Sequence, residues 1–338
     1  MSDKSDIAIV ILNYNTLHYL EQFVPKVLEF SGDSKLIVVD NASTDGSREY
    51  LNAHKDQFDS ILLDENFGYA GGYNRALAQI NSEYYVLLNT DVEVSENWLL
   101  PLKRLMDDNA NVAAVQPKIK AYNDIRLFEY AGASGGLMDK WGYPFCRGRI
   151  FDELEIDHGQ YDTPMQIFWA TGAAFMVRSE VFHQCGGFDE RFFAHMEEID
   201  LCWRMQHRGF EIYVEPGSEV FHVGGGTLAN GSSFKYYLNY RNNLAMLTKN
   251  LSSKTWYLVL LWKMVLDGVS ALNFLIGGRP SVLWQVLKAH MAYWSNLGLW
   301  IKERKKIDKG YDDSKLFQKS IVWEYFIKRN RKYSDLSI

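Results

Sequence analysis

YYVLLNTD, residues 84–91, predicts a buried strand of an α/β sheet that stops abruptly at polar side chains. Ligands of open α/β sheets sit just outside the carboxyl ends of the strands, so this strand delivers Asn89, Thr90 and Asp91 to a ligand-binding edge. A carboxylate beside an amide oxygen suits a hard divalent cation, and Asp91 is therefore the candidate metal ligand. Taken alone, these residues also fit an ordinary turn after a strand, so the other stretches decide between the two.

Two earlier apolar runs also end in polar side chains. IAIVIL, residues 7–12, leads into Asn13 and Asn15. KLIVV, residues 35–39, leads into Asp40. Neither run alternates between apolar and polar positions, so both predict strands that are buried on both faces. An acidic residue at a strand end near the start of a βα unit can accept hydrogen bonds from a base or a ribose, and Asp40 is the candidate for that contact.

A glycine-rich segment, NFGYAGGYNRAL at residues 66–77, leads into a predicted helix. Glycines in this position let backbone amides approach a diphosphate, and a helix N-terminus favours the negative charge. The spacing matches neither the dinucleotide-binding fingerprint nor the P-loop, which disfavours a dehydrogenase or an ATPase. A glycine turn that simply starts a helix explains the segment equally well.

Three acids stand within four positions at the start of another predicted helix, MEEIDLCWR at residues 196–204. Like charges this close, when partly buried, raise at least one pKa, and a carboxylate with a raised pKa suits a general base. Stabilisation of the helix dipole and a salt bridge to Arg204 are the alternative, which we expect for Asp200 more than for Glu198. Further along, His222 ends a predicted strand beside a glycine run, where a histidine is either a ligand or a structural residue.

The composition is that of a folded protein with an unusually high aromatic content. The 338 residues are 47% hydrophobic and 14% aromatic, with ten Trp, and suit one large α/β domain with an appendage. The three cysteines are odd in number and lack metal spacing, so neither a disulfide framework nor a zinc site is indicated, and a reducing cytosol fits. The first apolar run is too short for a signal peptide and lacks a basic lead.

Charge is divided along the chain. Residues 1–234 carry 18 Lys and Arg against 35 Asp and Glu, a net −17, whereas residues 235–338 carry 18 against 7, a net +11. The two parts therefore face different partners, and the acidic first part argues against binding to nucleic acid. Residues 117–164 are rich in glycine and aromatic residues and lack periodicity, so we expect loops and short strands that build a substrate pocket.

The C-terminal part contains a nearly continuous apolar segment at residues 256–276. One polar stripe at helical spacing interrupts it: Lys263, Asp267, Ser270 and Asn273. A membrane-spanning helix would bury Lys263 and Asp267 at roughly 2.5–3.5 kcal/mol each, so an in-plane helix or a hydrophobic hairpin is favoured. A second Trp-rich segment, residues 282–301, leads into basic clusters at residues 302–306 and 328–332. Tryptophan beside basic clusters is typical of anchoring on anionic lipid, and a homodimer interface is the alternative.

Eight motifs, taken in order, resemble one known family. They are VILNYN, VVDNASTDGS, NFGYAGGYNRAL, YYVLLNTDVEV, ATGAAFMVR, GGFDERFF, MEEIDLCWR and VFHVGGGT. Together they are similar to the inverting nucleotide-sugar transferases of glycosyltransferase family 2, especially its bacterial rhamnosyltransferase-like branch. The resemblance covers about residues 7–245, and eight motifs in one order are highly specific.

The resemblance implies an α/β protein with a GT-A fold: a Rossmann-like, mixed and mainly parallel sheet flanked by helices, followed by a C-terminal helical, membrane-associating extension. We expect a glycosyltransferase domain at residues 1–240 and a helical aromatic and basic region at residues 241–338. Within the first domain, residues 1–115 would bind the nucleotide sugar, and residues 116–240 would bind the acceptor and carry the catalytic residues.

The resemblance also implies roles for single residues on the donor side. Asp91 matches the metal-binding carboxylate and His222 matches a histidine that completes the site for Mg²⁺ or Mn²⁺. The first acid of the family's metal motif is Asn89 here, which lowers the charge offered to the cation. For Arg241, contact with a phosphate and a helix-surface salt bridge are both open. The remaining residues implied to contact the nucleotide sugar are Asn13, Asn15, Asp40, Asn66, Gly71, Asn74 and Asn89.

The general base of the family falls on Glu198. The family has Asp at this position, and the register between Glu197 and Glu198 is open, with Asp200 in the same acidic group. The implied reaction is a single displacement with inversion, in which Glu198 deprotonates an acceptor hydroxyl that attacks the anomeric carbon of the donor sugar.

The implied donor is a UDP- or dTDP-linked sugar, such as dTDP-rhamnose or a UDP-hexose. We expect a glycan acceptor linked to a polyprenyl diphosphate, in bacterial cell-surface polysaccharide synthesis, and an enzyme that is cytoplasmic and peripheral on the inner face of the membrane. A catalytically silent, nucleotide-sugar-binding scaffold subunit is the alternative, but it has no need of acids at Asp91 and Glu198. A nucleotidyltransferase would need two adjacent metal-binding carboxylates and a basic phosphate loop, and neither is evident.

Overall fold

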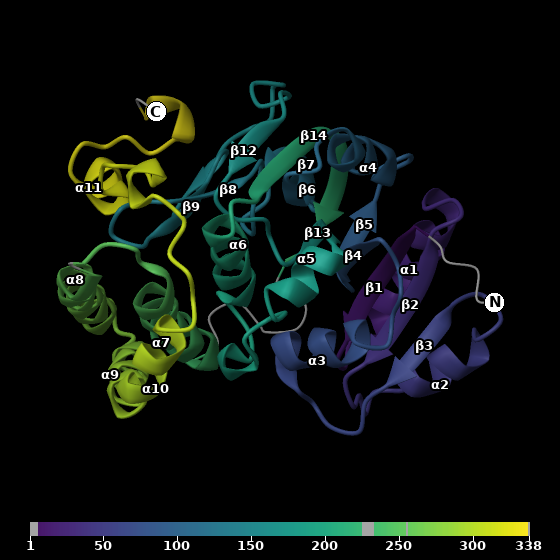
Figure 1. Cartoon of the computed structure of the whole chain (residues 1–338), viewed down its shortest axis with the longest axis horizontal. Helices are drawn as coiled ribbons and strands as arrows, with labels where there is room; N and C mark the ends of the chain where they lie inside the picture. Colours follow the sequence, from purple (N-terminus) through teal and green to yellow (C-terminus); the bar gives the residue numbers. More distant parts are fainter. Residues whose placement is uncertain (1–5, 225–232, 255, 337–338) are drawn as a thin grey trace.

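The computed structural model describes residues 6–224, 233–254 and 256–336. A mixed sheet with helices on both faces forms the body of the molecule, and a group of C-terminal helices packs against one side of it (Figure 1). The two ends of the chain lie on opposite sides of the molecule in this view. This architecture confirms the predicted α/β class with a helical C-terminal extension.

One half of the sheet consists of parallel strands: β1 (Ile7–Asn13), β2 (Lys35–Asp40), β3 (Asp59–Leu62) and β4 (Tyr84–Asn89). The apolar residues of β1 and β2 are buried on both faces, which is why these strands show no alternation in the sequence. The register places Asn13 beside Asp40 and Leu12 beside Asn89. The polar strand ends predicted from the sequence therefore meet at one edge of the sheet.

The other half of the sheet is mixed and contains β6 (Val112–Ala121), β12 (Met165–Ile167), β13 (Ala174–Arg178) and β14 (Glu211–His222). Two strands lie off the main path: β5 (Val92–Val94), paired with β14, and β7 (Asp124–Phe128), paired with β6. The order is β12-β14-β6-β13-β4-β1-β2-β3, in which β13 is antiparallel to both neighbours and β14 is parallel to β6.

Helices connect the strands and cover both faces of the sheet: α1 (Leu17–Phe30), α2 (Ser47–Ala53), α3 (Gly68–Leu77), α4 (Leu99–Asp108), α5 (Ser179–Gln184) and α6 (Glu197–His207). Successive side chains of a strand point to opposite faces. In β1, Ala8 and Val10 accordingly join one apolar cluster, and Ile9 and Ile11 join another. The two clusters form the core on the two sides of the sheet.

The glycine-rich region begins later than residue 117, because β6 continues to Ala121. It then forms β7 and a small antiparallel sheet of four strands: β8 (Gly136–Met138), β9 (Pro144–Cys146), β10 (Arg149–Ile150) and β11 (Glu153–Leu154). Phe145 and Ile150 of this sheet pack against Ile321 and Leu336 near the C-terminus. The loops and short strands expected here are thus partly covered by the end of the chain.

The C-terminal region is helical: α7 (Ser233–Asn250), α8 (Trp256–Ile276), α9 (Pro280–Ser295), α10 (Leu297–Arg304) and α11 (Ile321–Phe326), with single 3₁₀ turns at Asp313–Lys315 and Tyr333–Asp335. α7 contacts α6 on one side and α8, α9 and α10 on the other. The boundary expected between residues 240 and 241 falls inside α7, whose Leu244 and Leu247 belong to the main core. α7 therefore joins the sheet domain to the helices that follow.

Candidate active site

A hollow of about 290 Å³ opens at the edge of the sheet where β1, β4 and β14 end. Loops at residues 129–131 and 171–173 and the start of α6 form the rest of its wall. The predicted site residues in its lining are Asn66, Asn89, Asp91, Glu197, Glu198 and His222. The predicted site residues outside its lining are Asn13, Asn15, Asp40, Gly71, Asn74, Asp200 and Arg241.

His222 lies between two carboxylates in this hollow. Its Nε2 is 3.2 Å from Oδ1 of Asp91, and its Nδ1 is 3.2 Å from Oε2 of Glu129, the second contact being an ion pair rather than an aligned hydrogen bond. Pairing of β5 with β14 sets this arrangement, because the N–H of Val223 donates to the carbonyl oxygen of Asp91. Burial by itself lowers the pKa of His222, but Asp91 and Glu129 outweigh that effect and raise the pKa to about 10.

The Asp91 and His222 side chains fit a divalent cation. Adjacent ligands of an octahedral ion, each about 2.1 Å from it, lie about 3 Å apart, which is close to the separation of Asp91 Oδ1 and His222 Nε2. Glu129 approaches the other ring nitrogen, as an outer carboxylate usually does beside a metal-bound histidine. Within the ranges that the structure describes, no three His, Cys, Asp or Glu side chains form a complete metal cluster. Two protein ligands suit an ion that also binds substrate phosphates and water.

Glu197 and Glu198 begin α6 and face the same hollow. Oε2 of each has no hydrogen-bond partner among the described residues. Burial raises the pKa of Glu198 to about 7, although hydrogen bonds with the main chain of the first helical turn act to lower it. Burial and the adjacent Glu198 carboxylate raise the pKa of Glu197 well above its ordinary value. Near neutral pH, Glu198 can therefore accept a proton, whereas the carboxyl group of Glu197 favours its protonated form more than an ordinary glutamate does.

The turn before α6 has an unusual backbone conformation. Phe193, His195 and Met196 have φ angles of 66°, 68° and 73°, a region that residues other than glycine adopt rarely and at a cost. Asn242 of α7 offsets that cost by donating from Nδ2 to three carbonyl oxygens of the turn. These are the oxygens of Phe192, Ala194 and His195, at 3.0, 2.9 and 2.8 Å. We call residues 192–196 the catalytic turn, since it leads directly into Glu197.

Asp200 and Arg241 hold this region together from outside the hollow. Asp200 is fully buried and forms ion pairs with Arg204 and Lys249, both at 2.8 Å. Burial raises its pKa, but the two cations outweigh that effect and lower the pKa below its ordinary value. Arg241 donates to the carbonyl oxygen of Phe192 at 3.1 Å. Both side chains thus connect α6 or the catalytic turn to α7.

The residues predicted to surround the base form a hydrogen-bonded cluster beside the hollow. Nδ2 of Asn13 donates to Oδ1 of Asp40 at 3.2 Å and to Oγ of Ser43 at 3.0 Å. The backbone N–H of Asn15 donates to the same hydroxyl at 3.0 Å, and Arg48 donates to Asp40 at 2.7 Å. Asn13 and Asp40 are fully buried, so they fix the loops after β1 and β2. Contact between Asp40 and a base stays a prediction.

The glycine-rich segment contributes to the hollow mainly through Asn66. Its Oδ1 accepts from Nδ2 of Asn41 at 3.0 Å and from the N–H of Gly68 at 2.9 Å, which shapes the entry into α3. Asn74 instead exchanges two hydrogen bonds of 2.9 Å with the backbone of Phe188, and so ties α3 to residues 186–189, which we call the GGFD turn. A Cβ atom on Gly71 would lie 2.9 Å from Cβ of Phe67, so close packing accounts for that glycine.

The structure adds lining residues that the sequence did not single out. Glu129 and Lys235 face the hollow, and so does His195, whose buried Nε2 has no hydrogen-bond partner among the described residues. Burial and the nearby Lys235 lower the pKa of His195 to about 4, so its ring is neutral. Glu129 stands in a stretch without periodicity, so no pattern in the sequence pointed to it as a site residue. His195 stands two residues before the acidic group that begins at Glu197, and this position could have identified it from the sequence.

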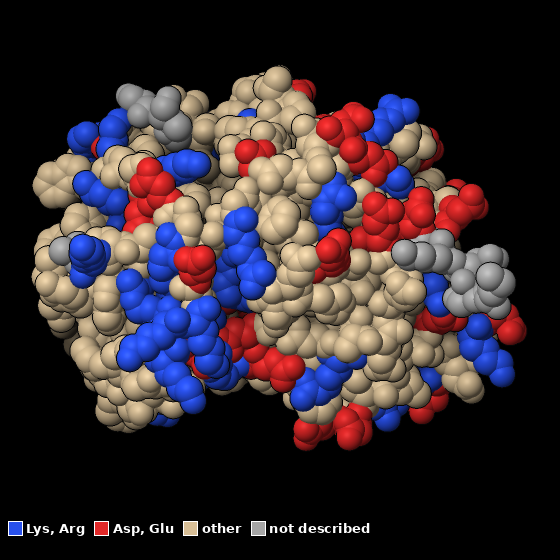
Figure 2. Space-filling model, in the orientation of Figure 1, with Lys and Arg blue, Asp and Glu red and all other residues tan. Residues whose placement is uncertain are grey.

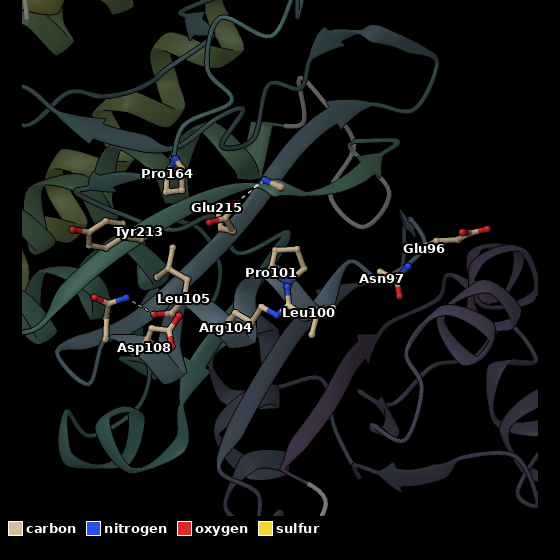
Figure 3. Close-up of a pocket in the computed structure, with 12 residues that line it drawn as sticks. Glu96, Asn97, Leu100, Pro101, Arg104, Leu105, Asp108, Pro164, Tyr213 and Glu215 are labelled. Carbon is tan, nitrogen blue, oxygen red and sulfur yellow. Dashed lines mark hydrogen bonds between the residues drawn. The ribbon is translucent and has the colours of Figure 1, made fainter.

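Two other hollows lie apart from these residues. One, of about 570 Å³, lies between α4 and β14, with Arg104 and Asp108 on the helix and Tyr213 and Glu215 on the strand (Figure 3). None of the predicted site residues lines it. A second, of about 770 Å³, lies beside α6 and α10 and includes only Asn74 among them. Volume alone therefore does not identify the site, and the grouping of the buried acids Glu197 and Glu198 with Asp91 and His222 makes the smaller hollow the candidate.

Comparison with known proteins gives a family match over the first half of the chain. The family model described as glycosyl transferase family 2 matches residues 8–184. The low-salt glycan biosynthesis hexosyltransferase Agl10 of Haloferax volcanii is 26% identical over 243 residues, which cover 70% of this chain and 74% of that protein. An N-acetylglucosaminyl-diphospho-decaprenol L-rhamnosyltransferase of Mycobacterium tuberculosis is 24% identical over 233 residues, which cover 64% and 75%.

Two solved structures share the fold. GalNAc-T7 with UDP, GalNAc and Mn²⁺ superposes with a TM-score of 0.57 at 15% identity, over 74% of this chain and 48% of that one. The mannosyltransferase PcManGT of Pyrobaculum calidifontis, with GDP-Man and Mn²⁺, gives a TM-score of 0.52 at 14% identity, over 90% and 85%. These structures agree with the predicted GT-A architecture.

Proposed function

The chain belongs to glycosyltransferase family 2, and from this we propose that it transfers a sugar from a nucleoside-diphosphate sugar to a glycan acceptor, with inversion at the anomeric carbon. One observation carries the proposal: the carboxylate of Glu198, whose Oε2 has no hydrogen-bond partner among the described residues, faces the same hollow as Asp91 and His222. This grouping supports a base and a site for the donor diphosphate in one place, as a single displacement requires.

Glu198 is the general base of the proposed reaction. Its carboxylate takes the proton of the acceptor hydroxyl while that oxygen bonds to the anomeric carbon and the bond from this carbon to the diphosphate oxygen breaks. The raised pKa of Glu198, about 7, matches a base that works near neutral pH. Burial and the adjacent Glu198 carboxylate raise the pKa of Glu197, which favours a carboxyl group that donates a hydrogen bond in the same hollow.

Asp91 and His222 are the proposed ligands of a divalent cation, Mg²⁺ or Mn²⁺. When bound there, the cation neutralises the charge that develops on the departing nucleoside diphosphate. The neutral ring of His195 and the side chain of Lys235 line the same hollow. The solved structures named above hold Mn²⁺ together with a nucleotide or a nucleotide sugar, which supports this assignment.

The donor is a UDP- or dTDP-linked sugar and the acceptor a lipid-linked glycan, so the enzyme works at the inner face of the cell membrane. Support comes from the mycobacterial relative, whose name specifies a decaprenol-linked acceptor and rhamnosyl transfer, and from the haloarchaeal relative named for glycan biosynthesis. The apolar helix α8 adds a membrane-directed feature. Residues 1–115, with the cluster of Asn13, Asn15 and Asp40, are assigned to the donor, and residues 116–240 to the acceptor.

Calorimetric titration with UDP and with dTDP, each with and without Mn²⁺ or Mg²⁺, tests the donor side. We expect one nucleotide to bind in a metal-dependent manner and to lose that dependence in Asp91→Ala. Absence of binding by both nucleotides under every condition would overturn the assignment of the hollow to these donors.

Substitution of the base tests the catalytic side. Glu198→Gln should lower transfer by about 10²–10⁴-fold and leave nucleotide binding largely intact, because the amide keeps the size of the side chain but cannot accept the proton. Glu197→Gln is the matched variant and should lower transfer less. The opposite order of the two effects would move the base to Glu197.

A further inference from the structure

α8 and α9 expose an apolar face of unusual extent. On α8 it comprises Tyr257, Leu258, Leu261, Trp262, Val265, Val269, Leu272, Leu275 and Ile276, and on α9 Trp284, Leu287, Met291 and Trp294. Each of these side chains is at least 45% exposed, and Ile276 at the turn between the helices is 86% exposed. Scattered apolar residues are normal on a protein surface, but a continuous set of this size marks an interaction surface.

The polar residues of α8 point the other way. Lys263 and Asp267 are 4% and 1% exposed and pair with each other one helical turn apart, and Nε2 of His290 on α9 lies 3.2 Å from Asp267. The ammonium group of Lys263 also lies 4.4 Å from the ring centre of Tyr143 in the small sheet. A surface helix that faces water exposes its charged side chains and buries its leucines against the protein. α8 has the reverse arrangement, so its exposed face suits apolar surroundings.

Contacts along α8 fix its direction relative to the domain. Trp262 packs on Trp141, Ser270 shares a hydrogen bond of 2.8 Å with Tyr240, and Phe274 packs on Tyr236. These contacts extend over most of the helix length, from residue 262 to residue 274. By length and composition α8 alone among the described helices is able to cross a membrane, with a mean hydropathy of 1.6. These contacts hold α8 lengthwise against the domain, and they would have to break for α8 to cross a membrane.

The charges around this face match an anionic partner. Between Lys254 and Ile301 the sequence has one acidic residue, the buried Asp267, whereas the basic Lys254, Arg279 and Lys288 are exposed. In Figure 2 the margin over α8 and α9 is mostly uncharged, and basic side chains gather next to it over α7 and α10. A second copy would bring the same positive rim against itself, whereas anionic headgroups complement it.

We infer that α8 and α9 form a face that lies in the plane of an anionic lipid bilayer and enters the boundary between headgroups and acyl chains without crossing it. The inference deepens the proposed function, on which it rests, because it assigns to particular residues the surface that meets the membrane of the acceptor. Exposed Trp beside Lys and Arg is the combination that favours this interfacial depth.

Sedimentation of the full chain with vesicles tests the inference. The protein should bind phosphatidylcholine vesicles that contain phosphatidylglycerol and bind much less to phosphatidylcholine alone. Val265→Glu with Val269→Glu should weaken binding to the anionic vesicles by roughly tenfold or more, because two charges enter the apolar face. Leu100→Glu is the matched control, since Leu100 is 45% exposed on α4, far from α8 in Figure 1, and should bind like the wild type.

A readout without mutation accompanies the variants. Brominated acyl chains in the anionic vesicles should quench tryptophan fluorescence of the wild-type protein, since Trp262, Trp284 and Trp294 lie on the face. Unquenched fluorescence with the protein left in the supernatant would overturn the inference. Retention of the protein in the membrane after alkaline carbonate extraction would replace it with a spanning helix.

Two further measurements separate the remaining outcomes. A wild-type dimer that the double variant converts to a monomer, without vesicle binding by either, would assign the face to a second copy. Binding of UDP or dTDP in the presence of Mn²⁺ should be equal in the wild type and the double variant. Loss of nucleotide binding with vesicle binding intact would overturn the proposed function and leave the lipid face standing.

Discussion

Glu198 carries the pH dependence expected of this protein. The base must be ionised, and burial raises its pKa to about 7, so kcat/KM for transfer should rise as pH increases through 7 and level off above it. The sign follows from the direction of the shift: below the raised pKa the carboxyl group is protonated and cannot accept a proton. A pH–rate profile measured with saturating metal checks this, and a profile that is flat across pH 7 would contradict it.

Glu129 should control metal affinity through His222. Glu129→Gln removes the negative charge 3.2 Å from Nδ1 and should weaken Mn²⁺ binding by about 10–100-fold, the usual loss when the outer partner of a ligating histidine is changed. Calorimetry with Mn²⁺ alone measures it. Glu93→Gln is the control, because Glu93 pairs with Lys26 and should leave the affinity unchanged. Equal affinities for all three proteins would exclude Glu129 from this role.

Single residues show where sequence reasoning succeeds and where it fails. Asp91 and His222 are 131 residues apart, yet both were predicted, because each follows a strand that ends at the same edge of the sheet. Glu129 follows β7 in a region without periodicity, and only the fold brings it to His222. Local pattern therefore finds residues placed by strand ends, and it misses those placed by irregular loops.

At the scale of elements, α7 supports the catalytic turn. Asn242→Leu removes the amide that donates to three carbonyl oxygens; that of Phe192 keeps Arg241 as a donor, whereas those of Ala194 and His195 lose this donor at about 1–3 kcal/mol each. The turn with its positive φ angles should then relax, so that kcat falls about tenfold or more while KM for the donor changes little.

Asn239→Leu on the same helix is the control for that experiment. Among the described residues, Nδ2 of Asn239 donates to the carbonyl oxygen of Lys235 within α7 and not to the catalytic turn, so this variant should keep its kcat. A parallel loss of activity in both variants would mean that α7 is generally sensitive to substitution and does not act through Asn242.

Elements with strong periodicity were predicted well, and their junctions were not. The strands ending at Asn13, Asp40 and Asn89 and the helix that begins with Glu197 lie where the apolar patterns place them. The boundary at residue 240 was drawn where composition changes, but α7 runs through it because one face of this helix completes the core of the sheet domain. The change in composition reflects the surroundings of the exposed side chains, whereas the packing of the core can continue past that residue.

At the scale of the whole molecule, the buried ion pairs of Lys249 link α6, the GGFD turn and α7. Its Nζ lies 2.8 Å from Asp200 and 2.6 Å from Asp189. Lys249→Met removes one cation from each of these buried carboxylates, which keep Arg204 and Arg191 as partners, and should lower the free energy of unfolding by roughly 3 kcal/mol, the lower end for breaking a buried ion pair. Chemical denaturation measures the change, with Lys103→Met as control.

Lys103 pairs with Asp107 on the surface of α4, where both side chains are partly exposed. Loss of such a pair changes the free energy of unfolding by about 1 kcal/mol or less. A cost for Lys249→Met no greater than that of the control would contradict a stabilising role for the ion pairs of Lys249.

One helix, α7, touches the catalytic turn through Asn242 and the hairpin of α8 and α9 through its opposite side. With the face of α8 and α9 on lipid, as inferred above, the protein would hold Glu198 at a constant height above the membrane. Under the proposed function, an acceptor anchored in that membrane would reach the base only when its glycan spans this height. Selection of the acceptor would then depend on the length of its glycan as well as on the identity of its terminal sugar.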